Sequence, residues 1–246
     1  MSRPHWIPLE SNPEVVNKFV FGMGMKPSWQ FHDVFGLDPD LLAMIPQPAC
    51  ALMLLFPVNE KHRQHKSDED ERLKKEEQHV SKNVYFMKQN IGNACGTIGV
   101  LHAIANNQDV LDFGTNLSPE AFLCGHLSST DDGYLKTFLA KTKDMSAEKR
   151  AEYLETDESI SDAHEASAQE GQTAAPQRDE SVDLHFIAFV HKDGHIYELD
   201  GTKSFPINHG KSSSETFLKD AAKVCQSFME RDPGEMRFTI MALAKA

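Results

Sequence analysis

LHFIAFVHKDGHIYELD, residues 184–200, is the clearest β-structure signal in the chain. Two runs rich in aromatic and β-branched residues flank the dipeptide Asp193-Gly194, which is typical of a two-residue hairpin turn. The sequence therefore predicts two antiparallel strands, at residues 184–190 and 195–199, joined by a tight turn.

The turn also determines which side chains share a face of this hairpin. With two residues in the turn, Lys192 pairs with His195, and Asp200 then lies opposite Ile187. His185 is two residues from Ile187, so its side chain points to the same face as that of Asp200. The two side chains are therefore predicted to be diagonal neighbours. A three-residue turn would place them on opposite faces.

Working outward from the hairpin, the chain is a mixture of helical patterns and apolar runs, which indicates a mixed α and β class. The helical patterns begin at Pro13, Pro39, Ala94, Leu111 and Thr216, and the apolar runs that predict buried strands occupy residues 49–56 and 237–243.

Composition narrows the function classes. The chain has 246 residues, and 25 Lys and Arg against 37 Asp and Glu give a net charge of −12. This balance argues against a nucleic-acid-binding protein and against a polybasic membrane anchor. No apolar run approaches 18 residues, so no membrane span is predicted. Four widely spaced cysteines do not form a disulfide framework, which favours a reducing compartment, the cytosol or the nucleus.

Two segments carry most of the charge. Residues 60–79 mix both signs and predict a solvated helix or loop, with His62, His65 and His79 as surface residues. Residues 155–183 contain nine acidic residues and one arginine, a net charge of −8, with no aromatic side chain. Such a composition predicts a mobile loop, and a loop this long is usually a lid, a binding loop or a linker.

The segment QNIGNACG, residues 89–96, carries the strongest chemical signal. Asn93 is predicted to cap the following helix, which places Cys95 in the first helical turn. Free amides and the helix dipole favour a thiolate there. The side-chain amide of Gln89 and the backbone amide of Cys95 would form an oxyanion hole. A lone cysteine is more often a small buried apolar residue.

The predicted hairpin favours catalysis over that alternative, because a thiol nucleophile needs a base and the base needs an orienting group. His185 would deprotonate Cys95, and Asp200 would orient the imidazole. Zinc binding at His191 and His195 has little support, because no further ligand clusters with them. Cys50 and Cys225 lie in apolar patterns and are predicted to be core residues. Cys124 lies in a region whose structure the sequence does not indicate.

These motifs resemble a known family. QNIGNACGTIG at 89–99, DLHFIAF at 183–189 and ELDG at 198–201 are similar to the ubiquitin C-terminal hydrolases, papain-like cysteine peptidases of peptidase family C12. The resemblance extends over residues 6–233 and is strongest to the small single-domain L-type enzymes that also act on the nearest ubiquitin-like modifier. It implies an α+β fold with a mostly antiparallel six-stranded sheet between helices and a knotted backbone, over a single catalytic domain at 1–246.

The resemblance also implies residue roles. Cys95 matches the nucleophile, Gln89 the oxyanion donor, His185 the general base and acid, and Asp200 the orienting carboxylate. An active-site crossover loop falls around 156–182, and a possible insertion occupies 114–133. The residues that match ubiquitin contacts form three groups: Pro8, Leu9, Glu10, Ser11, Asn12 and Pro13; Ala168, Gln169, Glu170, Gly171, Gln172, Thr173, Ala174 and Ala175; and Glu235, Met236, Arg237, Phe238, Thr239 and Ile240.

The function that the resemblance implies is a deubiquitinating thiol hydrolase. It would cleave small or unfolded adducts, as esters, thioesters or amides, from the C-terminal glycine of ubiquitin and of a ubiquitin-like modifier. It would need no metal or other cofactor and would act as a monomer in the cytoplasm and also in the nucleus. Two alternatives are a non-catalytic protein that sequesters ubiquitin and an acyltransferase for small molecules that uses the same triad.

Overall fold

The computed structural model describes residues 4–114, 133–174, 176, 180 and 182–246. A six-stranded sheet forms its centre, with the strand order β1-β6-β2-β3-β4-β5 and antiparallel pairing throughout. The strands are β1 (Trp29–Asp33), β2 (Ala49–Pro57), β3 (Leu184–Lys192), β4 (His195–Leu199), β5 (Ile207–Lys211) and β6 (Thr239–Lys245). The predicted α+β class with an antiparallel six-stranded sheet is confirmed.

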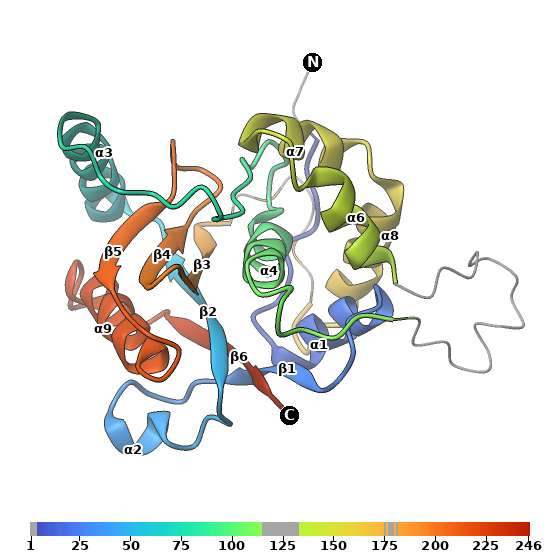
Figure 1. Ribbon diagram of the computed structural model, residues 1–246, viewed down its shortest axis with the longest axis horizontal. Coiled ribbons are helices and arrows are strands. Elements are labelled where there is room, and N and C mark those ends of the chain that lie inside the picture. The colour runs from blue at the N-terminus through green and yellow to red at the C-terminus, as the bar shows by residue number, and fades with distance from the viewer. Residues whose placement is uncertain (1–3, 115–132, 175, 177–179, 181) are drawn as a thin grey trace, which may run out of the picture.

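Helices cover both faces of the sheet (Figure 1). One face packs against α9 (Phe217–Glu230), which also contacts α2 (Pro39–Leu42). The other face packs against α4 (Cys95–Ala105). Beyond α4 lie α1 (Pro13–Gly22), α6 (Tyr134–Thr142), α7 (Ala147–Glu155) and α8 (Glu158–Ala168), and α3 (Glu60–Lys75) lies at the opposite side of the molecule.

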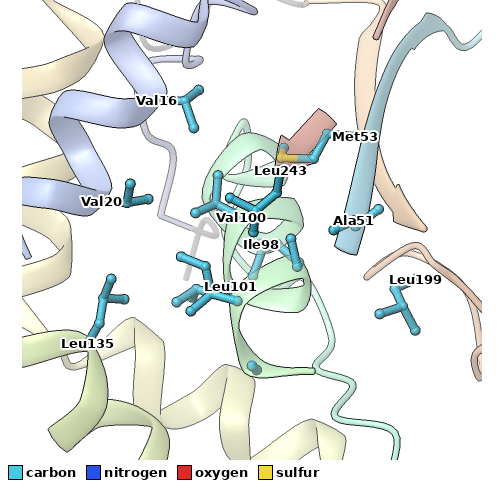
Figure 2. Close-up of a cluster of buried hydrophobic side chains, with 14 of the residues drawn as sticks. Val16, Val20, Ala51, Met53, Ile98, Val100, Leu101, Leu135, Leu199 and Leu243 are labelled. Carbon is cyan, nitrogen blue, oxygen red and sulfur yellow. The ribbon is translucent and has the colours of Figure 1, made fainter. Parts of the chain in front are cut away.

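Helix α4 is the structural centre of the larger core. Every residue from Cys95 to Ala105 is buried. Figure 2 shows side chains of α4 between Val20 of α1 and Met53 of β2, so the helix contacts apolar groups on both sides. A helix that is apolar all round belongs in such a position. Its burial holds the N-terminal end, which carries Cys95, in one place relative to the sheet.

The acidic segment is more ordered than its composition predicts. The expectation of a structureless loop from residue 155 onward is wrong for its first part, because Glu158–Ala168 forms helix α8. Asp157 caps this helix by accepting a hydrogen bond from the amide of Ile160. Ile160, His164 and Ala168 are buried on its inner face. Ile160 is the one large apolar side chain on this face, and a single such residue among small and polar ones is too weak an apolar signal for composition to reveal.

The charged segment at residues 60–79 forms helix α3, which ends at Lys75. The prediction that it is merely solvated is wrong on one face, because His62 and Glu69 are buried. The His62 ring packs against Phe56, with 5.2 Å between ring centroids. Glu69 forms an ion pair with the buried Lys203 at 2.5 Å. A charged residue can be buried when it is paired in this way. The number and sign of the charges along the sequence do not show that such a pair forms.

Several predictions fall outside the described residues. They include Cys124 and all but the ends of the 114–133 segment. None of the helices in the described part of the chain is long and apolar enough to cross a membrane. The knotted path of the backbone stays a prediction.

Candidate functional site

The hairpin has the predicted register. Lys192 pairs with His195 and Ala188 pairs with Leu199, so the two-residue turn is confirmed. The Nε2 atom of His185 lies 2.8 Å from Oδ1 of Asp200. These side chains are 12% and 4% exposed, which shields their interaction from water.

Asp200 is itself fixed by the loop that follows β4. Thr202 donates two hydrogen bonds to Oδ1 of Asp200, from its amide at 2.9 Å and from its hydroxyl at 2.7 Å. Burial alone would raise the pKa of Asp200, but the charge and hydrogen bond of His185 hold it well below its usual range. Asp200 is therefore a carboxylate that favours the protonated imidazolium of His185.

Cys95 begins helix α4, as predicted, but the cap differs. Ala94 occupies the N-cap position and gives no side-chain hydrogen bond. Asn93 instead adopts a left-handed conformation with φ of 60°, which asparagine tolerates better than most residues. The predicted capping role of Asn93 is therefore wrong, because the chain turns sharply just before the nucleophile candidate and moves this side chain away from the helix amides.

Cys95 and His185 form a coupled pair. Burial would raise the pKa of the Cys95 thiol, but a hydrogen bond and the positive charge of His185 outweigh it, so the pKa is lowered. Burial would lower the pKa of His185, but Asp200 and Cys95 raise it instead. Because Nε2 of His185 faces Asp200, Nδ1 is the ring nitrogen left for the thiol. The arrangement therefore favours a thiolate beside an imidazolium.

The other described cysteines lack this environment. Burial raises the pKa of Cys50 and of Cys225 well above the usual value, and no cation compensates at either position. Cys225 is fully buried in the core, as predicted, while Cys50 is only partly buried. Of the three cysteines in the described part of the chain, Cys95 alone has a lowered pKa.

Gln89 lies beside the thiol on an adjacent loop. Its amide donates to the carbonyl of Gly201 at 2.9 Å, which ties this loop to the residue after Asp200. A Cβ at Gly201 would lie 3.0 Å from Cβ of Gln89, so this close approach favours glycine. The side-chain amide donates to the carbonyl of Ile91 at 3.2 Å. It lines the same cavity as Cys95, where it could meet a developing oxyanion.

Asn93 is a further polar group that sequence reasoning did not assign to the site. Its Nδ2 atom is buried and has no hydrogen-bond partner, and its side chain lines the cavity next to Cys95. Oε1 of Gln89 is buried and unpartnered in the same way. Buried amide groups of this kind are uncommon unless a ligand satisfies them. A signal existed in the sequence, since asparagine just before a helix can also adopt a left-handed turn.

Two cavities meet at Cys95. One has a volume of about 450 Å³ and a mixed lining that contains most of the charged side chains near Cys95. It extends from Gln89, Cys95 and His185 to the inner face of α3 and the end of α9. The other has a volume of about 320 Å³ and is lined mainly by apolar side chains, among them Leu9, Leu55, Ala168, Leu184 and Phe186. We refer to them as the polar cavity and the apolar cavity. The thiol lies at the boundary between them.

The apolar cavity brings together residues from all three groups that match ubiquitin contacts. They are Pro8, Leu9, Glu10 and Ser11 from the first group, Ala168 and Thr173 from the second, and Thr239 from the third. A carboxylate oxygen of Glu10 accepts a hydrogen bond from the amide of Thr173 at 3.3 Å, so the first two groups touch directly.

Other members of these groups lie elsewhere. Asn12 caps α1, and with Pro13 and Gln172 it lines a separate cavity beside the exposed Phe35. Met236 is 84% exposed, and Ile240 belongs to the core on the α9 face. Ala175 is outside the described residues. Within the described part of the chain, no cluster of three or more histidine, cysteine or acidic side chains could hold a metal ion.

Comparisons with known proteins show which family the chain resembles over nearly its whole length. The family model described as "Ubiquitin carboxyl-terminal hydrolase, family 1" matches residues 6–230. The ubiquitin carboxyl-terminal hydrolase isozyme L1 of Homo sapiens is 49% identical over 239 residues, which cover 97% of this chain and 98% of that protein. A ubiquitin carboxyl-terminal hydrolase of Drosophila melanogaster is 47% identical over 241 residues, 98% of each chain.

A solved structure shares the fold. The crystal structure of the Trichinella spiralis UCH37 catalytic domain bound to ubiquitin vinyl methyl ester superposes with a TM-score of 0.71 at 21% identity. The superposition covers 100% of this chain and 98% of that one.

Proposed function

Because the chain belongs to the ubiquitin carboxyl-terminal hydrolase family, we propose that it is a cysteine-type deubiquitinating hydrolase that cleaves adducts from the C-terminal glycine of ubiquitin. The observation that carries the proposal is that Cys95, at the start of α4, shares a cavity with His185, whose Nε2 atom is held by Asp200 at 2.8 Å. The lowered pKa of the Cys95 thiol agrees with this arrangement. A thiolate, its proton donor and the group that orients that donor are the parts that acyl transfer through a thioester needs.

The proposed reaction proceeds in two stages. The Cys95 thiolate attacks the glycine carbonyl carbon, and the C–O, C–S or C–N bond to the leaving group breaks. The imidazolium of His185 gives its proton to the departing atom. Water, deprotonated by the now neutral His185, then attacks the thioester and releases the carboxylate and the thiol. Asp200 stabilises the charged imidazolium through both stages, which is the role that its buried carboxylate supports.

The negative oxygen that forms at the carbonyl needs donors. The Cys95 amide at the start of α4 and the side-chain amide of Gln89 are the proposed pair, and both lie at the cavity. Nδ2 of Asn93 is a third donor that has no partner in the unbound protein. Preorganised donors of this kind act without having to rearrange during the reaction.

The apolar cavity is the proposed channel for the C-terminal tail of ubiquitin, since residues from all three contact groups line it. The tail carries arginines next to two glycines, and the carboxylate of Glu10 in the wall of this cavity is complementary to their charge. Residues 156–182 would cross over the site and restrict the leaving group to small or unfolded adducts. We extend the proposal to a ubiquitin-like modifier as a second substrate and to a monomer in the cytosol and nucleus.

The proposal is tested by measuring how fast the protein releases a fluorogenic leaving group from the C-terminus of ubiquitin. The wild-type protein should release the fluorophore, and Cys95→Ala should not. Cys50→Ser is the matched control, because this thiol has a raised pKa and lies away from both cavities, and it should keep wild-type activity. Full covalent labelling of Cys95→Ala by an electrophilic ubiquitin derivative would exclude Cys95 as the nucleophile. Tight ubiquitin binding by the wild type with negligible turnover would favour the sequestering alternative instead.

A further inference from the structure

The inner face of α3 carries polar residues toward the catalytic centre. His62, Lys66 and Glu69 follow each other at intervals of four and three residues, so their side chains share one face of the helix. His62 and Lys66 line the polar cavity together with Cys95 and His185. The helix that looks like a solvated surface element in the sequence is therefore one wall of the site.

This inference rests on the proposed function and concerns the side of the site that takes the leaving group. Residues that match ubiquitin contacts line the apolar cavity on one side of Cys95. The two groups attached to the scissile carbonyl carbon must lie on different sides of the attacking sulfur. The departing group therefore occupies the polar cavity, whose volume of about 450 Å³ suits a small molecule or a short peptide.

The carboxylates that line the polar cavity all have cationic partners. Asp200 is bonded to His185, and Glu198 is paired with Lys203 at 2.5 Å. Asp183 is paired with Arg237 at 2.9 Å. The negative charges at this side of the site are therefore already compensated within the protein.

Two cations at the same cavity form no direct ion pair with a carboxylate of the described residues, although the charges of Glu198 and Glu69 act on Arg231 from a longer distance. Lys66 donates hydrogen bonds to the carbonyl of Thr202 at 3.1 Å and to its hydroxyl at 2.5 Å, both neutral acceptors. An ammonium group has three donors, so one N–H is left for a ligand. The guanidinium of Arg231 stacks on the ring of Phe228, 3.6 Å from its centroid. Within the described part of the chain, no carboxylate forms an ion pair with either cation.

The positions of these cations match the position of a leaving group. Lys66 bonds to Thr202, which in turn donates to Asp200, and its charge contributes to the environment of the Asp200 carboxylate. Lys66 is thus linked to the carboxylate of Asp200 through a single residue, Thr202. In an adduct with one amino acid, the α-carboxylate carbon is two bonds from the departing nitrogen. A carboxylate so close to the scissile bond would lie beside Lys66, and one further along a longer adduct would approach Arg231.

We propose that Lys66 and Arg231 form an anion-recognition site for the leaving group, so that the enzyme prefers small adducts bearing a carboxylate near the scissile bond. Amino acids and short peptides with a free α-carboxylate belong to this class. Lys66 and Arg231 are specificity-determining residues here, because they contact the leaving group and take no part in bond making or breaking. The preference is electrostatic, so it decreases as ionic strength rises.

The test uses two substrates that differ in one group. Ubiquitin extended at its C-terminus by one alanine is prepared with a free carboxylate and with a carboxamide, and kcat/KM is measured for each by mass spectrometry at low salt. The ratio of the two values is the readout, because a general loss of activity cancels in it. The wild-type protein should favour the carboxylate by about fivefold, the effect of one partly exposed charge pair.

Variants of the full chain identify the residues responsible. Lys66→Gln should bring the ratio to about one, Lys66→Glu should reverse it, and Lys66→Arg should restore it. Arg231→Gln is measured with a glutamate extension, whose side-chain carboxylate reaches further into the cavity, against a glutamine extension. Lys75→Gln removes the same charge from an exposed position in the last turn of α3 and should keep the wild-type ratio.

Two results would contradict the inference. One is a wild-type ratio near one at low salt while both substrates are hydrolysed. The other is a ratio that Lys66→Glu leaves unchanged. Failure to hydrolyse either substrate would overturn the proposed function itself, so the two failures are distinguishable.

Discussion

Oδ1 of Asp200 accepts three hydrogen bonds, one shared with Nε2 of His185 at 2.8 Å and two from Thr202. One oxygen atom therefore joins the end of β4, the loop that follows it and the first residues of β3. This contact keeps the imidazole in one orientation and raises the pKa of His185 while the pKa of the Cys95 thiol is lowered. The pKa values of Cys95 and His185 therefore set the acid and alkaline limits of the proposed activity. Acid protonates the Cys95 thiolate, and alkali removes the His185 proton that the leaving group needs.

Asp200→Asn should narrow the pH range of activity from both sides. Without the carboxylate, the pKa of His185 falls, so the alkaline limb of kcat/KM moves to lower pH. Because His185 is then protonated less of the time, it also stabilises the Cys95 thiolate less, so the acid limb moves to higher pH. At the optimum, kcat/KM should fall by roughly 10²- to 10⁴-fold, as for other orienting carboxylates. A pH profile with a fluorogenic ubiquitin substrate measures this, and unchanged limbs would show that Asp200 does not control the pair.

Gln89→Ala should reduce kcat by roughly 10²- to 10³-fold with little change in KM, because an oxyanion donor acts mainly in the transition state. Asn93→Gly tests the additional donor. Glycine accepts the left-handed backbone at this position, so the variant removes the side-chain amide without straining the turn. A smaller loss of kcat, about tenfold, is expected if Nδ2 assists Gln89. Steady-state kinetics with the fluorogenic substrate give both values. An unchanged kcat for Asn93→Gly would assign the buried amide to structure alone.

The parts of the fold that were predicted correctly rest on local signals. The turn Asp193-Gly194 sets the register of the hairpin, and that register alone places His185 beside Asp200. Helix α8 is not predicted because its inner face has one large apolar residue, Ile160, among small and polar ones, and packing against its neighbours stabilises it. The role of α3 was missed because the partner that allows Glu69 to be buried, Lys203, lies 134 residues further along the chain. Such a pairing becomes visible only after the chain has folded.

Lys203→Met should destabilise the fold because it leaves Glu198 and Glu69 without their shared cation. Lys203 is 7% exposed and Glu198 is fully buried. Loss of one partner from a buried pair costs about 3–5 kcal/mol in the free energy of unfolding. Urea unfolding at pH 7 measures it, with the exposed Lys75→Met as control. A difference below about 1 kcal/mol would mean that water or His209 compensates Glu198.

The same variant gives a pH dependence whose sign follows from Glu198. Burial opposes the charge of this carboxylate, but Lys203 and His209 hold its pKa below the usual value. A lowered pKa in the folded state stabilises the protein above the unfolded pKa, about 4.3, and this contribution disappears as the pH falls below it. The stability difference between wild type and Lys203→Met should therefore stay level between pH 7 and pH 5 and decrease as the pH falls from about 4.3 toward the folded-state pKa of about 2. If the stability difference instead increased as the pH falls, the pKa of Glu198 would be raised in the folded protein, which would contradict its pairing with Lys203.

A buried histidine joins the helix that begins at Cys95 to the first group of residues that match ubiquitin contacts. Nε2 of His164 in α8 donates to the carbonyl of Ile7 at 2.6 Å, so its Nδ1 accepts from the hydroxyl of Thr97 at 2.7 Å. Ile7 directly precedes the residues that line the apolar cavity, and Thr97 is two residues from Cys95. The two hydrogen bonds therefore fix the wall of the proposed tail channel relative to the thiol.

Thr97→Val removes the donor but keeps the shape of the side chain, so Nδ1 of His164 loses its buried partner. The free energy of unfolding should fall by about 1–3 kcal/mol. Because the channel wall loosens while the triad stays intact, KM for the fluorogenic substrate should rise more than kcat falls. Thr97→Ser, which keeps the hydroxyl, should restore KM. If kcat falls and KM does not change, the hydrogen bond positions the thiol of Cys95 rather than the channel.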